Sequence, residues 1–159
     1  IEMMHPADWE EAFHGEQIAV TTCVMARLQE RLLRGKRPCM LPSVLTKDSI
    51  MSHFGVKFGG KCWEEYNKKR LDKQGADQLN VQLERSWPEI QEKLSAVIIP
   101  SETLVSILQR AGAPVNFKDI NLDEFFFADA VLHAREIRNR YTFLDLASDA
   151  GMMNPKEII

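Results

Sequence analysis

Apolar residues recur at intervals of three and four along most of this chain, the period of an amphipathic α-helix. The first clear example runs from His14 to about Leu33, where Ile18, Met25 and Leu28 follow this spacing and Gly35 supplies a stop. No segment shows a convincing alternation of apolar and polar residues, which would indicate a half-buried strand. The sequence therefore predicts an all-α fold with about seven or eight helices.

Glycine and proline divide the rest of the chain. A loop is expected over 35–43, a short helix over 46–54, a second over 60–71 and a longer one over 76–98. Pro88 falls inside the longest of these helices and is expected to kink or divide it.

Helix ends in the second half of the chain are predicted from capping residues. A helix is expected over 101–112, and Asn121 is predicted to cap the next one. Thr142 and Asp145 have the spacing of a capping box, and Gly151 is the expected end of the last helix.

Length and charge limit the class of protein. A chain of 159 residues is expected to be one domain, over 1–159, with a core of its own. A net charge of -3 argues against nucleic-acid binding, and the basic run at 68–70 is interpreted as a solvated helix face. No apolar run approaches the ~18 residues that span a bilayer, so no membrane partner is expected.

The N-terminus and the cysteines both bear on the cellular location of the protein. The N-terminus lacks the pattern of a signal peptide and an initiator methionine, so the natural start is expected to lie upstream. Cys23, Cys39 and Cys62 are too few and too widely spaced for a disulfide framework, which favours free thiols and a cytoplasmic protein.

Histidines are the strongest candidates for chemistry. His14 opens the first helix, Gly15 lets other groups approach, and Glu16 is placed to orient a neighbouring metal ligand. One imidazole cannot hold a metal that needs about three protein ligands, so His14 is interpreted as part of a site completed elsewhere. His53 is expected to offset a helix dipole, and His133 to be either a buried hydrogen-bonded side chain or a functional one.

The remaining candidates are weaker. His5, before Pro6, is interpreted as an exposed or capping residue. The sequence has no nucleophile elbow and no glycine-rich nucleotide loop, so no catalytic nucleophile and no cofactor-binding residue is assigned in this chain. Arg138 and Arg140 belong to an arginine-rich run before the last helix. They are either surface salt-bridging residues or ligands of a substrate phosphate.

Four segments resemble a known family. Residues 14–20, HGEQIAV, are similar to the metal-ligand helix of the iron-dependent alcohol dehydrogenase and dehydroquinate synthase superfamily. Residues 83–90, 111–114 and 134–146 narrow the resemblance to the C-terminal half of sn-glycerol-1-phosphate dehydrogenases. The likeness covers nearly the whole chain, and the segment 134–146, AREIRNRYTFLDL, points to this subfamily.

The resemblance implies a helical C-terminal domain whose partner is its own N-terminal NAD(P)-binding domain. It also implies reduction of dihydroxyacetone phosphate by hydride transfer, with zinc, nickel or iron as the Lewis acid. By the resemblance, His14 matches the last of three metal ligands, and the other two lie upstream of this chain. The fragment alone is expected to be inactive and not to bind NAD(P), and the full-length enzyme to be a homo-oligomer.

Two alternatives stay open at this stage. The chain could belong to a related member of the superfamily, such as a glycerol dehydrogenase or a dehydroquinate synthase relative. It could also be a non-catalytic helical interaction module that serves as a scaffold or dimerisation partner.

Overall fold

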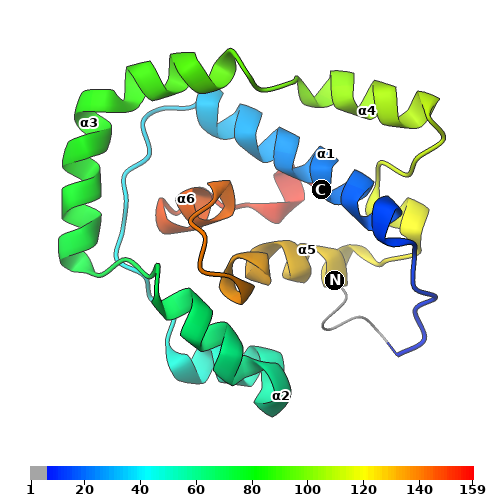
Figure 1. The fold of residues 1–159 in the computed structure, drawn as a ribbon, viewed down its shortest axis with the longest axis horizontal. Coiled ribbons are helices and arrows are strands. Elements are labelled where there is room, and N and C mark those ends of the chain that lie inside the picture. The colour runs from blue at the N-terminus through cyan, green and yellow to red at the C-terminus, as the bar shows by residue number, and fades with distance from the viewer. Residues whose placement is uncertain (1–6) are drawn as a thin grey trace. The chain divides into compact units, whose positions relative to one another are not determined.

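The computed structural model describes residues 7–159, and these residues fold into helices without any β-strand (Figure 1). The α-helices are α1 (His14–Arg34), α2 (Lys47–Asn67), α3 (Lys73–Ser95), α4 (Ser101–Arg110), α5 (Glu124–His133) and α6 (Phe143–Asp149). Three short 3-10 helices are η1 (Phe117–Ile120), η2 (Ala134–Ile137) and η3 (Pro155–Glu157). The all-α fold class predicted from the apolar periodicity is confirmed. No helix in this described range is both long and apolar enough to cross a bilayer.

The described residues group into two compact units. The first comprises 7–36, 89–130 and 154–159, and the second comprises 37–88 and 131–153. Helices α3 and α5 each contribute residues to both units. The expectation of a single domain over 1–159 stays a prediction, because each unit is described by itself.

The core of the first unit is built on α1. The buried face of this helix includes Val20, Cys23 and Leu28. Of the three residues on which the sequence prediction was based, Leu28 is buried, Met25 is half-buried and Ile18 is 50% exposed. Phe117 and Phe127 stack with ring centroids 5.4 Å apart, and Trp9 donates its indole N–H to the carbonyl oxygen of residue 120 at 2.8 Å. These aromatic contacts bury rings from three separate segments of one unit.

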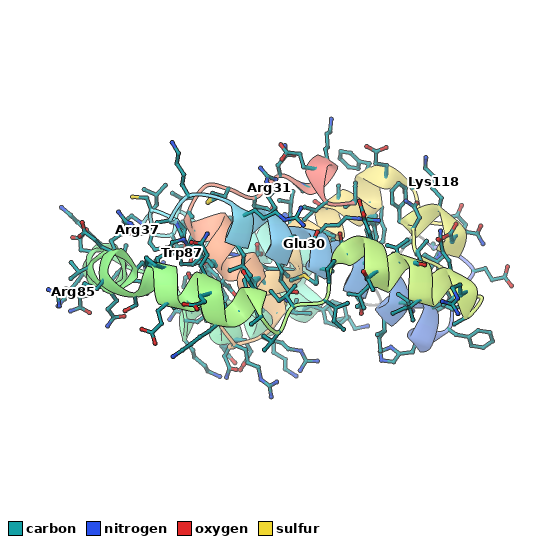
Figure 2. The ribbon with its side chains drawn as sticks, turned by 90° about the horizontal axis from the view of Figure 1, so that it is seen from above. Glu30, Arg31, Arg37, Arg85, Trp87 and Lys118 are labelled. Atoms are coloured by element: carbon teal, nitrogen blue, oxygen red, sulfur yellow. The ribbon has the colours of Figure 1, made fainter. Side chains whose placement is uncertain are left out.

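Polar contacts fix α4 against α1 within the first unit (Figure 2). The carboxylate of Glu30, on α1, accepts the backbone N–H of Ser101 at 3.0 Å and its hydroxyl at 2.7 Å. Ser101 is the first residue of α4, where backbone N–H groups have no partner inside the helix. The negative charge of Glu30 therefore caps α4 from a neighbouring helix and favours its positive end.

Helix α2 is the first helix of the second unit, and it is interrupted at Gly55. Thr46 caps it by accepting the backbone N–H of Ser49 at 3.1 Å. Gly55 has φ 68° and ψ 177°, a conformation that is essentially restricted to glycine. The predicted end of a helix at Gly55 is thus a break inside α2, and the second half begins directly after it instead of at residue 60.

The segment before α2 is extended and is held by a side chain. The amide of Asn80, on α3, donates to the carbonyl oxygen of Met40 at 2.9 Å and accepts its backbone N–H at 2.7 Å. Met40 is buried, so both of its backbone groups need partners away from water. One amide supplies both partners.

Two further boundaries differ from the sequence prediction. Asn121 does not cap the N-terminus of α5. It has φ 55° and lies at the C-terminal end of η1. Asp123 caps α5 instead, by accepting the backbone N–H of Phe126 at 2.9 Å. Asparagine tolerates the left-handed conformation, which explains its place after η1. Pro88 lies inside α3, which runs as one helix from Lys73 to Ser95, so the expected division is not seen and the expected kink stays a prediction.

The last helix agrees with its prediction. The carboxylate of Asp145 accepts the backbone N–H of Thr142 at 2.8 Å, as a capping-box acid does. Helix α6 ends at Asp149, and Gly151 follows with φ 64°, so the predicted stop lies two residues past the last helical one.

Candidate functional site

His14, the predicted metal ligand, is the first residue of α1, and it is exposed. The two apolar side chains near it, Phe13 and Ile18, are also exposed, by 81% and 50%. A Cβ placed on Gly15 would meet no atom within 4 Å, so the backbone here is open to approach. These features agree with a residue that serves a site completed by other groups, but the ligand role of His14 stays a prediction.

Glu16 makes a hydrogen bond at the start of α1 that was not predicted from the sequence. Its carboxylate accepts the backbone N–H of Phe13 at 2.8 Å, which satisfies one of the donors at the start of α1. The predicted role of Glu16 in orienting a metal ligand stays a prediction, and helix capping is the role seen here.

Arg138 and Arg140, the candidate phosphate ligands, are exposed residues of the second unit. The backbone carbonyl oxygen of Arg140 accepts a hydrogen bond from the Lys69 ammonium at 3.0 Å. The guanidinium groups of Arg138 and Arg140 are accessible to an anion, and their role in binding phosphate stays a prediction. His14 and Glu16 belong to the first unit, so each pair is described within its own unit. His5 lies outside the described residues.

The third arginine of the run, Arg135, is buried and forms the centre of a polar cluster in the second unit. It donates to the carboxylate of Asp149 at 2.7 Å and to the hydroxyl of Tyr66 at 2.7 Å. Tyr141 donates to the other oxygen of Asp149 at 2.9 Å. Lys69 and Asp145 form a second buried ion pair at 2.7 Å. Arg135 is therefore held in place and is not the arginine that would meet a substrate phosphate.

Burial and charge act on the titrating groups of this cluster. Burial on its own lowers the pKa of Arg135, but the hydrogen bond and charge of Asp149, together with Tyr66 and Asp145, outweigh it, and the pKa is raised. Burial, together with the charge of Asp149, also raises the pKa of Tyr141 well above its ordinary value. Burial likewise raises the pKa of Tyr66. Both tyrosine hydroxyls are therefore protonated and neutral at physiological pH.

A cavity of about 300 Å³ opens in the second unit beside this cluster. Its lining comes from loop 41–45, the ends of α5 and α6, and η2. It combines apolar residues with polar ones, and the polar ones are Ser43, His133, Arg135, Glu136, Ser148 and Asp149. The volume is at the lower end of the range for small-molecule pockets. The cavity therefore has the size and the polar lining for a small ligand.

Two histidines meet at the end of α5. The rings of His53, on α2, and His133, the last residue of α5, stack with centroids 3.5 Å apart and planes 18° from parallel. Nδ1 of His133 lies 2.8 Å from a carboxylate oxygen of Glu136, which is only 2% exposed. Asp129 lies one turn before His133 on the same helix.

This histidine cluster was missed from the sequence. Asp129 and His133 have i,i+4 spacing, which places two side chains on one helix face, and this was the available signal. His53 comes from a distant segment, so its approach to His133 depends on how α2 packs against η2.

Comparison of the chain with protein-family models, curated proteins and solved structures finds no match.

Proposed function

We propose that this chain is the helical, metal-binding half of an NAD(P)-dependent sn-glycerol-1-phosphate dehydrogenase. The observation that carries the proposal is the resemblance of residues 14–20 and 134–146 to that family. The helical fold is compatible with it, because the resemblance implies a helical C-terminal domain. Dihydroxyacetone phosphate is the proposed substrate.

The surroundings of His14 support its proposed role. An exposed imidazole at the start of α1 is accessible to ligands supplied from outside this chain. Exposed Phe13 and Ile18 provide apolar surface beside it, against which an N-terminal cofactor domain could pack. The donor set fits a shared site, because a single imidazole supplies one of about three protein ligands that a catalytic divalent metal needs.

In the proposed mechanism this chain binds the metal and the substrate and orients them, and it supplies no group that reacts with the substrate. The metal, when bound, polarises the carbonyl oxygen that is being reduced. His14 holds its place at the rigid first turn of α1, which Glu16 caps through the N–H of Phe13. Arg138 and Arg140 offer exposed guanidinium groups whose geometry matches a phosphate. The nicotinamide that would supply the hydride would be held by the N-terminal domain and by no residue of this chain.

The test uses the full-length enzyme from the natural reading frame. His14→Ala should lower both bound metal and the rate of NAD(P)H oxidation with dihydroxyacetone phosphate, by about 100-fold or more. Lys93→Gln is the matched control, since its side chain is exposed and is not assigned to this reaction. An unchanged rate in His14→Ala would overturn the metal role.

The same preparation separates the alternatives. A preference for a non-phosphorylated alcohol would replace the substrate with that of a glycerol dehydrogenase relative. A reading frame that encodes only this helical region would favour the non-catalytic interaction module and would end the dehydrogenase proposal.

A further inference from the structure

The cavity of about 300 Å³ lies within the second unit, and the dehydrogenase function proposed above assigns no role to it. Every residue that lines it belongs to this unit. Its volume is about ten times the ~30 Å³ that one water molecule occupies in the liquid. A molecule of about five non-hydrogen atoms therefore fits inside it.

Glu136 contributes to the lining a carboxylate oxygen that lacks a partner. The residue is 2% exposed, and one of its two oxygens lies 2.8 Å from Nδ1 of His133. The other oxygen is buried and has no hydrogen-bond partner within the described range. A buried acceptor without a partner costs free energy. Because Glu136 lines the cavity, a donor on a molecule inside it can supply the missing hydrogen bond once the carboxylate turns toward it.

The other polar groups of the lining offer mainly acceptors. Both terminal nitrogens of Arg135 already donate, one to Asp149 and one to the hydroxyl of Tyr66. Each carboxylate oxygen of Asp149 accepts one hydrogen bond, although such an oxygen has two lone pairs. A ligand that matches this lining therefore carries several donors and few acceptors.

Charge and apolar surface narrow the class of ligand further. Arg135 and Asp149 form an ion pair at 2.7 Å, so their charges offset each other, and Glu136 adds a negative charge. His133 is the fourth titratable group of the lining. The apolar part of the lining consists of Leu41, Pro42, Val44, Leu45 and Leu132. This combination favours a small organic cation with an aliphatic portion.

We propose that this cavity binds a small primary alkylammonium ion. The ammonium group donates to the carboxylate of Glu136, and the short aliphatic chain lies against the apolar lining. An ammonium group has three donors and no acceptor, which matches a lining that is rich in acceptors. Its hydrogen bond to a carboxylate is charge-assisted and so is stronger than one between neutral groups. The site is separate from His14 and does not rest on the dehydrogenase proposal.

The experiment measures the affinity of the natural full-length protein for n-butylammonium chloride by calorimetric titration. It is done at about pH 8, where histidine is ordinarily neutral and an alkylammonium ion is charged. A ligand of this size should bind with a dissociation constant of about 1 mM. Tetramethylammonium has the same charge and the same number of non-hydrogen atoms but no N–H donor, and 1-butanol has the same chain but no charge. Both should bind at least about 10-fold more weakly. Equal binding of either compound overturns the proposal.

Two pairs of variants locate the site. Glu136→Gln removes the charge at nearly constant size and should weaken butylammonium binding by at least about 10-fold. Glu64→Gln is its matched control, because Glu64 is an exposed acid on α2 in the same unit. Far-UV circular dichroism shows whether Glu136→Gln is folded.

The second pair does not disturb the core. Val44 and Val56 are 90% and 92% exposed, and Val44 lines the cavity whereas Val56 does not. The added ammonium group of Val44→Lys should weaken binding by at least about 3-fold through repulsion, and Val56→Lys should leave it unchanged. Affinity for butylammonium that is the same in the parent, in Val44→Lys and in a folded Glu136→Gln overturns the site.

The same ammonium group also occurs on a lysine side chain, and a further ligand separates the two sources. Nα-acetyllysine amide carries this group on a peptide unit. Since the cavity is small, it should bind no more tightly than butylammonium does. Affinity more than about 10-fold higher would assign the site to a lysine of a peptide and overturn the proposal of a small amine.

Discussion

Replacing Arg135 alone should destabilise the protein more than replacing Arg135 and Asp149 together. Both side chains of this ion pair are 5% exposed, and their charged atoms are 2.7 Å apart. Arg135→Met leaves the carboxylate of Asp149 buried with the Tyr141 hydroxyl as its remaining partner. Asp149→Leu leaves the guanidinium with Tyr66 and the carbonyl oxygen of residue 145.

The magnitude follows from the cost of an uncompensated buried charge. Removing one member of a buried pair costs about 3–5 kcal/mol, so each single variant should lose that much stability. The double variant leaves no such charge and loses hydrogen bonds of two tyrosine hydroxyls, at about 1 kcal/mol or slightly more for each. The cycle should therefore show a coupling energy of about 3 kcal/mol or more between Arg135 and Asp149.

Urea unfolding followed by far-UV circular dichroism gives the free energy of unfolding for each variant. Lys93→Met is the matched control, because its ion pair with Glu89 is exposed on both sides and should be worth about 1 kcal/mol at most. If the two single losses add up to that of the double variant, the pair does not couple and the reasoning about burial is refuted.

Three smaller predictions concern single residues. Hydrogen bonds from the start of α4 hold the pKa of Glu30 below its ordinary value of 4.5. Its stabilisation is therefore present above that pH and lost as the pH falls below it, so urea unfolding of Glu30→Gln and the parent should converge in acid. Burial and Asp149 raise the pKa of Tyr141, so its contribution is present below the ordinary pKa of 10.0 and lost as the pH rises above it. Tyr141→Phe should flatten the alkaline decline in the free energy of unfolding, and an equally steep decline would contradict this. Gly55→Ala should cost about 1–3 kcal/mol in urea unfolding because of its φ of 68°, whereas Gly60→Ala, in regular helix and open space, should cost nothing.

Much of the fold could be predicted because helix formation leaves a local record. The span of α1 follows from apolar spacing that begins at His14 and from the stop at Gly35. The carboxylate of Asp145 is three residues from the N–H of Thr142 that it accepts, so that contact is readable from spacing alone. Asn121 misled because asparagine suits both a helix cap and a left-handed turn, and the residues around it decide between them.

The candidate site could be predicted less well because its contacts join distant segments. His53 and His133 stack only once α2 has packed on η2, and no local pattern encodes that packing. The same is true of Arg135, which was grouped with Arg138 and Arg140 by its position in a basic run. Its burial beside Tyr66 separates it from the two exposed arginines.

The amide of Asn80 has a consequence for chemical ageing of the protein. Deamidation converts asparagine to aspartate and replaces the group that donates to the Met40 carbonyl by a second acceptor. A carboxylate would face that carbonyl oxygen, so a change of one atom would turn an attraction into a repulsion. Protein in which Asn80 has been deamidated should lose the attachment of the extended segment before α2 while its helices stay intact. Faster amide hydrogen exchange at Met40 would show this loss.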